Sequence, residues 1–163
     1  EEYTEMGKQS LGYGDFVSED EVPYGKANKF DEIAFKSANA NFDKAIRLCP
    51  TYTPAYVGKA HLLYSVGEAE EAERLYKKAL EAVPNSFEVH LALGNLYSDL
   101  KDVQEAIKSY KRAIKADKKA PQPYEALAGI FGRMGLEDKA EECEEKAERL
   151  RKAQTKSRKK RKK

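Results

Sequence analysis

A 34-residue periodicity constrains the fold of this chain more than any other feature of its sequence. In each unit a ring-bearing residue precedes a small one and then a large apolar one: Tyr56, His90 and Tyr124, then Ala60, Gly94 and Ala128, then Leu63, Tyr97 and Phe131. Alanines follow in the second half of each unit, at Ala72, Ala106 and Ala140 and again at Ala79, Ala113 and Ala147. Because a unit of this length cannot bury its apolar face alone, the periodicity predicts a stack of similar units.

Turn-forming residues divide each unit into two helices. Gly67 and Gly135 lie where the first helix must stop, because glycine adopts the positive φ of a helix C-terminus at little cost. Lys101 stands at the same place in the middle unit. Pro84 ends the second helix of its unit, and Ser86 can cap the next helix. The columns of small residues then mark the points where two antiparallel helices cross closely.

These columns resemble the tetratricopeptide repeat, which places an aromatic, a small residue and an aromatic on helix A, and alanine, aromatic, alanine on helix B. The resemblance implies an all-α fold, a right-handed α-solenoid of antiparallel helix pairs with about four repeats. Tyr76 and Tyr110 occupy the aromatic position of helix B, so we expect both to be buried. Glu144 replaces the aromatic in the last unit, where an exposed capping helix requires a polar residue.

The units predicted by this register are residues 53–86, 87–120 and 121–154, the last with an extended capping helix. An earlier unit is predicted over residues 1–52, with helix B at about 31–49 and a loop insert at about 17–30. A frayed N-terminus with only helix B docked is the alternative. Residues 155–163 are predicted to be a disordered basic tail, because like charges repel one another.

Charge is distributed unevenly along the sequence. The whole chain has a net charge of +2, with 36% charged residues and 40% hydrophobic residues. Residues 151–163 hold nine basic residues and no acid, and the rest of the chain has 21 basic and 28 acidic residues, a net charge of -7. The body of the protein would therefore not attract polyanions, whereas its C-terminal segment would.

The sequence contains none of the common catalytic or phosphate-binding motifs. His61 and His90 fall in different columns, and a pair of imidazoles without a third ligand is a weak metal signal. Cys49 and Cys143 are far apart and are expected to be buried, reduced thiols. We therefore predict no enzyme activity, no metal and no cofactor. No uncharged stretch reaches the roughly 18 residues of a membrane helix, and we expect an intracellular protein, cytoplasmic or nuclear.

The resemblance implies that helices A line a concave groove that binds a partner peptide or helix. Helix spacing nominates twelve groove residues: Thr4, Lys8, Val57, His61, Tyr64, Leu91, Asn95, Ser98, Asp99, Gln122, Glu125 and Arg133. This wall mixes apolar and polar side chains with little net charge, which suits a peptide with apolar anchors. The predicted function is a non-catalytic scaffold or adaptor for protein–protein interaction, within a larger complex.

Some members of this family clamp the acidic carboxyl terminus of cytosolic chaperones with lysine, arginine and asparagine. Here Val57 and Leu91 stand where lysines would be needed, and Ala126 stands in place of an arginine. Asn95 alone resembles the clamp. We therefore expect no useful affinity for such a chaperone tail.

The C-terminal segment offers a second kind of partner. Its basic residues are Arg151, Lys152, Lys156, Arg158, Lys159, Lys160, Arg161, Lys162 and Lys163. They suit nucleic acid or an import receptor, or they act only as a solubilising tail. The segment has no aromatic residue for base stacking, so contact with RNA or DNA would be independent of base sequence and sensitive to salt. The alternative function is a nucleic-acid-associated assembly factor.

Overall fold

The computed structural model describes residues 29–160, and within this range the boundary between two structural units lies between Ala40 and Asn41. The described part of the first unit is the beginning of helix α2, which spans Lys29–Leu48. The predicted helix A over residues 1–16, and most of the predicted insert at 17–30, lie outside the described residues. Whether the first repeat is complete therefore stays a prediction.

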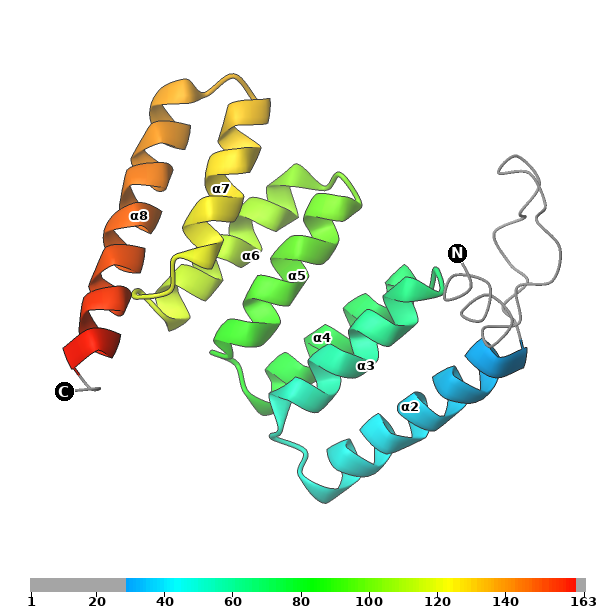
Figure 1. The fold of residues 1–163 in the computed structure, drawn as a ribbon. Helices are drawn as coiled ribbons and strands as arrows, with labels where there is room; N and C mark the ends of the chain where they lie inside the picture. Colours follow the sequence, from blue (N-terminus) through cyan, green and yellow to red (C-terminus); the bar gives the residue numbers. More distant parts are fainter. Residues whose placement is uncertain (1–28, 161–163) are drawn as a thin grey trace, which may run out of the picture. The chain divides into compact units, whose positions relative to one another are not determined.

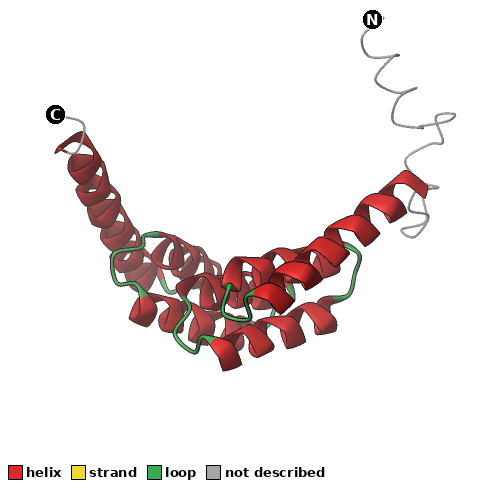
Figure 2. Cartoon of the chain, turned by 90° about the horizontal axis from the view of Figure 1, so that it is seen from below, coloured by secondary structure: helices red, strands yellow, loops and turns green. Residues whose placement is uncertain are grey.

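The second unit consists of consecutive helices joined by short turns (Figure 1). After the end of α2 they are α3 (Thr53–Ser65), α4 (Ala69–Ala82), α5 (Phe87–Asp99), α6 (Val103–Ala116), α7 (Gln122–Arg133) and α8 (Glu137–Lys160). The described residues contain helices and loops but no strand (Figure 2). The all-α fold is confirmed, and each 34-residue unit contains one helix pair: α3 with α4, α5 with α6, and α7 with α8.

The helix pairs share one turn geometry, repeated every 34 residues. Gly67, Lys101 and Gly135 have positive φ angles of 88°, 63° and 69°. In each turn the amide of the following residue donates to a carbonyl five residues back, as Asp102 N does to Tyr97 O at 2.8 Å. These bonds satisfy carbonyls that the end of a helix would otherwise leave without a partner.

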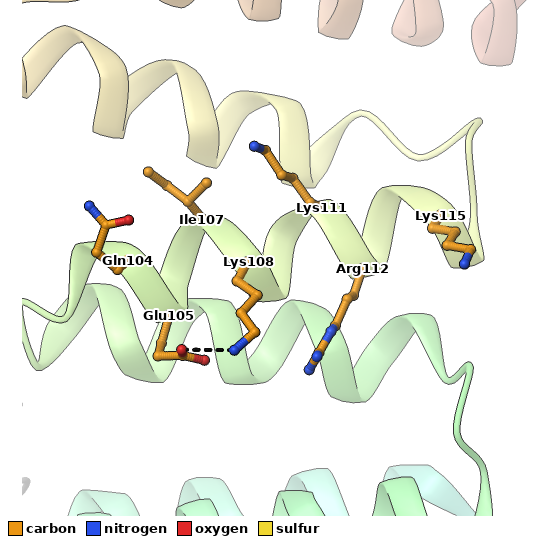
Figure 3. Close-up of a pocket in the computed structure, with 7 residues that line it drawn as sticks. All are labelled: Gln104, Glu105, Ile107, Lys108, Lys111, Arg112 and Lys115. Atoms are coloured by element: carbon orange, nitrogen blue, oxygen red, sulfur yellow. Dashed lines mark hydrogen bonds and ion pairs between the residues drawn. The ribbon is translucent and has the colours of Figure 1, made fainter.

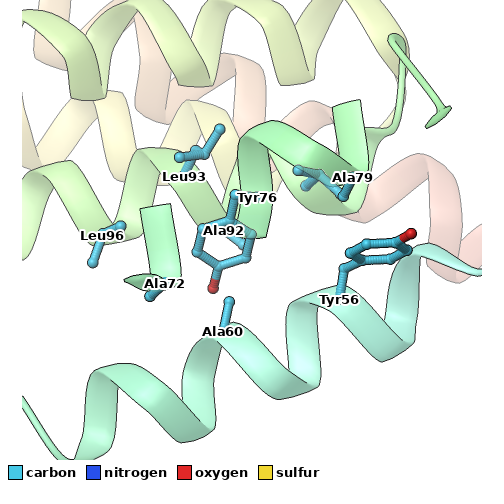
Figure 4. Packing of buried hydrophobic residues seen from close by; sticks show 9 residues of the cluster. Tyr56, Ala60, Ala72, Tyr76, Ala79, Ala92, Leu93 and Leu96 are labelled. Atoms are coloured by element: carbon cyan, nitrogen blue, oxygen red, sulfur yellow. The ribbon is translucent and has the colours of Figure 1, made fainter. Parts of the chain in front are cut away.

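Consecutive pairs stack through two clusters of buried side chains. Tyr76 is 1% exposed and lies among Ala60, Ala72 and the α5 residue Leu93 (Figure 4). Tyr110 is 3% exposed in the second cluster, so the predicted burial of both tyrosines is confirmed. These rings fill the space between one pair and the next, as the repeat pattern requires.

Glycines allow the closest helix contacts. A Cβ built on Gly94 of α5 would lie 2.5 Å from Cε1 of the Tyr110 ring, and one on Gly58 of α3 would lie 2.5 Å from Cε1 of Phe42. Each aromatic ring therefore rests on the backbone of the neighbouring helix.

A polar contact also links consecutive pairs. The Tyr97 hydroxyl of α5 donates to Oε1 of Glu73 on α4 at 2.7 Å, and Lys77 forms an ion pair with the same oxygen. The hydrogen bond from Lys77, followed by that from Tyr97, lowers the pKa of Glu73. Burial raises the pKa of Tyr97, and its hydrogen bond to Glu73 adds to the rise.

Helix α8 differs from the sequence prediction at its C-terminal end. Disorder was predicted from residue 155, whereas the structure continues the helix to Lys160. Glu148 pairs with Lys152 one turn later, and Gln154 Nε2 donates to Lys119 O at 3.0 Å. Charge repulsion among the lysines is therefore offset by local pairs, and cations at a helix C-terminus interact favourably with the helix dipole.

The prediction for the cysteines is wrong for Cys49. Its side chain is exposed, because it lies just beyond the end of α2 in the turn to α3. Cys143 is half-buried against the second cluster, and burial raises the pKa of its thiol. No helix among the described residues has both the length and the apolar character needed to span a membrane.

Candidate partner-binding face

The predicted groove residues that the structure describes all lie on the first helices of the three pairs. Thr4 and Lys8 lie outside the described residues. Val57, Tyr64, Leu91, Ser98 and Glu125 are half-buried, and His61, Asn95, Asp99, Gln122 and Arg133 are exposed. The set therefore contains both packed side chains and side chains that are free to contact a partner.

A hydrogen-bonded cluster joins residues from several helices. The Tyr110 hydroxyl of α6 donates to Asn95 Oδ1 of α5 at 2.8 Å. Burial raises the pKa of Tyr110, and the charge of Asp99 adds to the rise. A hydrogen bond from Ser98 and the charge of Arg133 on α7 oppose it. Asn95 thus accepts the hydrogen bond of this hydroxyl group, whereas Asp99 and Arg133 influence it through their charges, which act over longer distances.

Tyr64 extends this cluster to α3. Burial raises the pKa of Tyr64, and both the charge of Asp99 and a hydrogen bond to the Asp99 carboxylate raise it further. The carboxylate accepts this bond, because a phenol below its pKa donates. We call Tyr64, Asn95, Ser98, Asp99, Tyr110 and Arg133 the polar cluster. It brings together side chains from three consecutive repeats.

The apolar members of the predicted set contribute to packing. Val57 packs against the first core cluster, and Leu91 packs against the second. His61 contacts the Tyr76 ring edge-on, with the ring centroids 6.2 Å apart. Only part of the Val57 and Leu91 side chains is therefore open to a partner, whereas His61 is exposed.

Glu125 has a partner within the chain. Its Oε1 lies 2.7 Å from Nε of Arg151 on α8. The side chain therefore links the two helices of the last pair and is turned toward α8. Its place in the predicted groove rested on helix spacing alone, which does not reveal a residue 26 positions away in the sequence.

Two features of this face were missed or misassigned in the sequence analysis. Tyr110 was assigned only to the core, yet its hydroxyl group holds Asn95. Gly129 and Gly132 are exposed and stand one repeat after Asn95 and Ser98. A Cβ on Gly132 would meet nothing within 4 Å, and one on Gly129 would meet only Nη1 of Arg133 at 3.6 Å. Their place in the 34-residue register makes both glycines further candidates for the predicted groove.

The described residues contain no group of three or more side chains that could hold a metal ion. His90 is buried in the interface, where its Nε2 lies 3.0 Å from the Pro84 carbonyl oxygen.

The arrangement on α3, α5 and α7 offers hydrogen-bond donors, acceptors and apolar carbon, which are the groups that a peptide partner requires.

Comparisons with known proteins agree with this architecture. Residues 57–121 match the tetratricopeptide repeat family. No curated relative matches the chain by sequence.

Solved structures of MamA have similar folds. A crystal structure of MamA is 22% identical over 77% of this chain and 76% of its own, with a TM-score of 0.61. MamA from Desulfovibrio magneticus RS-1, from residue 41 to its end, is 20% identical over 76% and 70%, with a TM-score of 0.62. A third MamA structure is 24% identical over 76% and 67%, with a TM-score of 0.61. At these identities the likeness shows the fold.

Proposed function

Because this chain carries tetratricopeptide repeats, a fold of protein-interaction scaffolds, we propose that it is a non-catalytic adaptor that binds a partner peptide or helix along α3, α5 and α7. The observation that carries this proposal is the polar cluster. Its members come from three consecutive repeats: Asn95 accepts a hydrogen bond from Tyr110, and the charges of Asp99 and Arg133 act on the same hydroxyl group. A partner that follows the stack would meet them in order.

The polar cluster also suggests how a partner would be held. Asn95 accepts from Tyr110 through Oδ1, so its amide nitrogen remains available as a donor. Half-buried Val57 and Leu91 offer apolar carbon beside these polar groups. Gly129 and Gly132 leave the backbone of α7 bare, so a partner can approach this helix closely. An extended peptide or an amphipathic helix with apolar anchors fits this combination.

The test compares capture of partners by the intact chain and by two double variants, read by mass spectrometry. Asn95→Ala with Arg133→Ala removes exposed groups from the proposed face. Lys78→Ala with Asn85→Ala also removes one exposed amide and one positive charge, from α4 and the turn after it, and is the matched control. We expect the first variant to lose the partners that the control retains. Equal capture by both variants, with equal melting temperatures, would contradict the proposal.

The proposed partner is not an acidic chaperone tail. Val57 and Leu91 occupy the positions where the clamp needs lysines, and both are partly buried against the core clusters. Neither side chain can pair with a carboxylate. Saturable binding of such a peptide at low micromolar concentration in calorimetry would exclude this part of the proposal.

A second function is favoured by the C-terminal half of α8. Arg151, Lys152 and Lys156 are exposed on a helix that continues beyond the last repeat. They suit an assembly factor that binds RNA or DNA through its basic segment, with import into the nucleus as a further use of the same residues. Deletion of residues 155–163 tests this, since it should weaken nucleic-acid binding and leave partner capture unchanged. Unchanged nucleic-acid binding after the deletion would contradict it.

A further inference from the structure

The outer surface of α6 carries a shallow hollow of about 540 Å³ (Figure 3). It is lined by Ile107, Lys108, Lys111, Arg112 and Lys115, together with Glu105. Apart from the half-buried Ile107 and Glu105, these side chains are exposed. Figure 3 shows Lys111 and Arg112 extending to opposite sides of the helix, so the positive charges spread across the hollow.

Most of this charge is not neutralised within the described part of the chain. Lys108 pairs with Glu105 at 3.0 Å, whereas Lys111, Arg112 and Lys115 have no carboxylate within ion-pair distance among the described residues. In the preceding unit the equivalent helix α4 mixes both signs, with Arg74 paired to Glu71 and Lys77 paired to Glu73. Arg74, Lys77 and Lys78 stand 34 residues before Lys108, Lys111 and Arg112, so these basic positions follow the repeat register. The excess of positive charge on α6 arises because three acids of α4 are replaced: Gln104, Ile107 and Lys115 stand where α4 has Glu70, Glu73 and Glu81.

The basic surface continues from α6 to the end of α8. The turn after α6 carries exposed Lys118 and Lys119. Gln154 of α8 donates to the carbonyl oxygen of Lys119 at 3.0 Å, which brings Lys152 and Lys156 to the same end of the last two units. The one acid in this turn, Asp117, accepts a hydrogen bond from the backbone of Lys119. This contact places the last turns of α8 next to the turn that follows α6.

The composition of this surface favours a polyanion over a protein. Protein interfaces are enriched in aromatic residues and depleted of lysine, whereas lysine and arginine dominate contacts with phosphate groups. The hollow contains one apolar side chain, Ile107, and no aromatic ring. Basic residues three and four positions apart on a helix are neighbours and present their charges as a row. Such a row suits the regularly spaced charges of a phosphodiester backbone.

We propose that the outer face of α6 and the basic segment of α8 together bind the phosphate backbone of a nucleic acid, independently of base sequence. This rests on the second function proposed above and adds a structured part to the binding surface. The body has a net acidic composition, so a local basic surface decides where a polyanion can approach. The groove side of the chain remains available to a protein partner at the same time.

The experiment measures binding of the full chain to fluorescently labelled single-stranded RNA and duplex DNA by anisotropy, over a range of salt concentrations. Lys111→Gln, Arg112→Gln and Lys115→Gln are combined in one variant. Arg74→Gln, Lys77→Gln and Lys78→Gln on α4 form the matched control, because they remove the same number of positive charges from the equivalent helix. Deletion of residues 155–163 is the third variant, and it retains the contacts of Arg151 and Gln154.

We expect the α6 variant to lose roughly tenfold or more in affinity at low salt, and its salt dependence to fall by about two phosphate contacts on a log–log plot. The α4 control should change affinity by less than about twofold. Loss of binding only on deletion of residues 155–163, with the α6 variant unchanged, would overturn this inference and leave the second function intact. No binding by the intact chain would overturn both. Tighter binding of polyglutamate or of anionic vesicles than of either nucleic acid would assign the surface to another partner and also overturn the inference.

Discussion

The turn between α5 and α6 depends on Lys101, whose φ of 63° lies in the left-handed region. Gly67 and Gly135 occupy the equivalent turns, where glycine adopts such an angle without steric cost. A side chain there is unfavourable by about 1 kcal/mol or more. Part of this cost is offset because lysine restricts the unfolded chain more than glycine does.

Lys101→Gly should therefore stabilise the protein by roughly 0.5–1 kcal/mol. Urea unfolding measures the change as a shift of the midpoint without a change of slope. Gly67→Ala is the complementary variant and should destabilise by a similar amount. A Lys101→Gly variant that is less stable than the parent would show that the lysine side chain makes a compensating contact.

His90 gives the protein a specific sensitivity to mild acid. Burial lowers the pKa of His90, the hydrogen bond to the Pro84 carbonyl raises it, and the charge of Arg112 lowers it. The unfolded chain therefore binds a proton near pH 6.5, before the folded chain does. The stabilisation by neutral His90 is complete above about pH 6.5 and is lost as the pH falls below that value.

His90→Phe should remove this pH dependence, because phenylalanine does not titrate and a ring occupies the same column at Tyr56 and Tyr124. The free energy of unfolding, measured between about pH 7.5 and 5.5, should then be nearly constant. His61→Gln is the control: His61 is exposed, and its replacement should leave the pH dependence in place. A slope that disappears only in the His61 variant would refute the assignment.

At the scale of the element, the contact between α5 and α6 depends on a missing side chain. A Cβ at Gly94 would overlap the Tyr110 ring, and that ring is buried and held by its hydrogen bond to Asn95. Gly94→Ala should therefore destabilise by about 1–3 kcal/mol, although alanine is the better helix former.

Gly132→Ala is the matched control for this prediction, because it is also helical and its Cβ would meet no neighbour. It should stabilise α7 by about 1 kcal/mol. Thermal melting by circular dichroism distinguishes the two outcomes. Equal melting temperatures for both variants would mean that α5 and α6 are not held in this close contact.

The helices of the three complete units could be predicted from sequence because local signals agree with the periodicity. Glycine, proline and Ser86 mark the ends, and Ser86 indeed accepts a hydrogen bond from the amide of Val89. The hydrogen bond between Asn95 and Tyr110 could not, because it depends on how far each helix is rotated about its axis. The helical end of α8 was missed because repulsion among lysines was considered without Glu148.

The candidate face stays a prediction, but the exposure of several of its residues could be foreseen from sequence. Helix spacing found the exposed residues Asn95, Asp99 and Arg133, because one register applies to all units. The same spacing could not show that Glu125 pairs with Arg151, a contact across the last helix pair. The basic residues of α6 recur from α4 in the same register, but the register alone does not show that the charges of Lys111, Arg112 and Lys115 have no ion-pair partner among the described residues.

At the scale of the whole molecule, the predicted helix over residues 1–16 has a direct test. If it completes a first repeat, deletion of residues 1–28 removes a docked helix and its buried surface. Helicity and melting temperature should both fall, because each repeat in a stack is stabilised by its neighbours. An unchanged melting curve would favour the alternative, in which only the second helix of that unit is ordered.

Helix α8 spans 24 residues, a length of about 36 Å. Its first half is rich in glutamate, and from Arg151 onward all of its charged residues are basic. This separation gives α8 a negatively charged half and a positively charged half. A polyanion that approaches the protein is repelled by the acidic half of α8 and attracted by the basic half, so its orientation is biased before contact. At 0.1 M salt, screening by dissolved ions confines this effect to separations of up to about 10 Å.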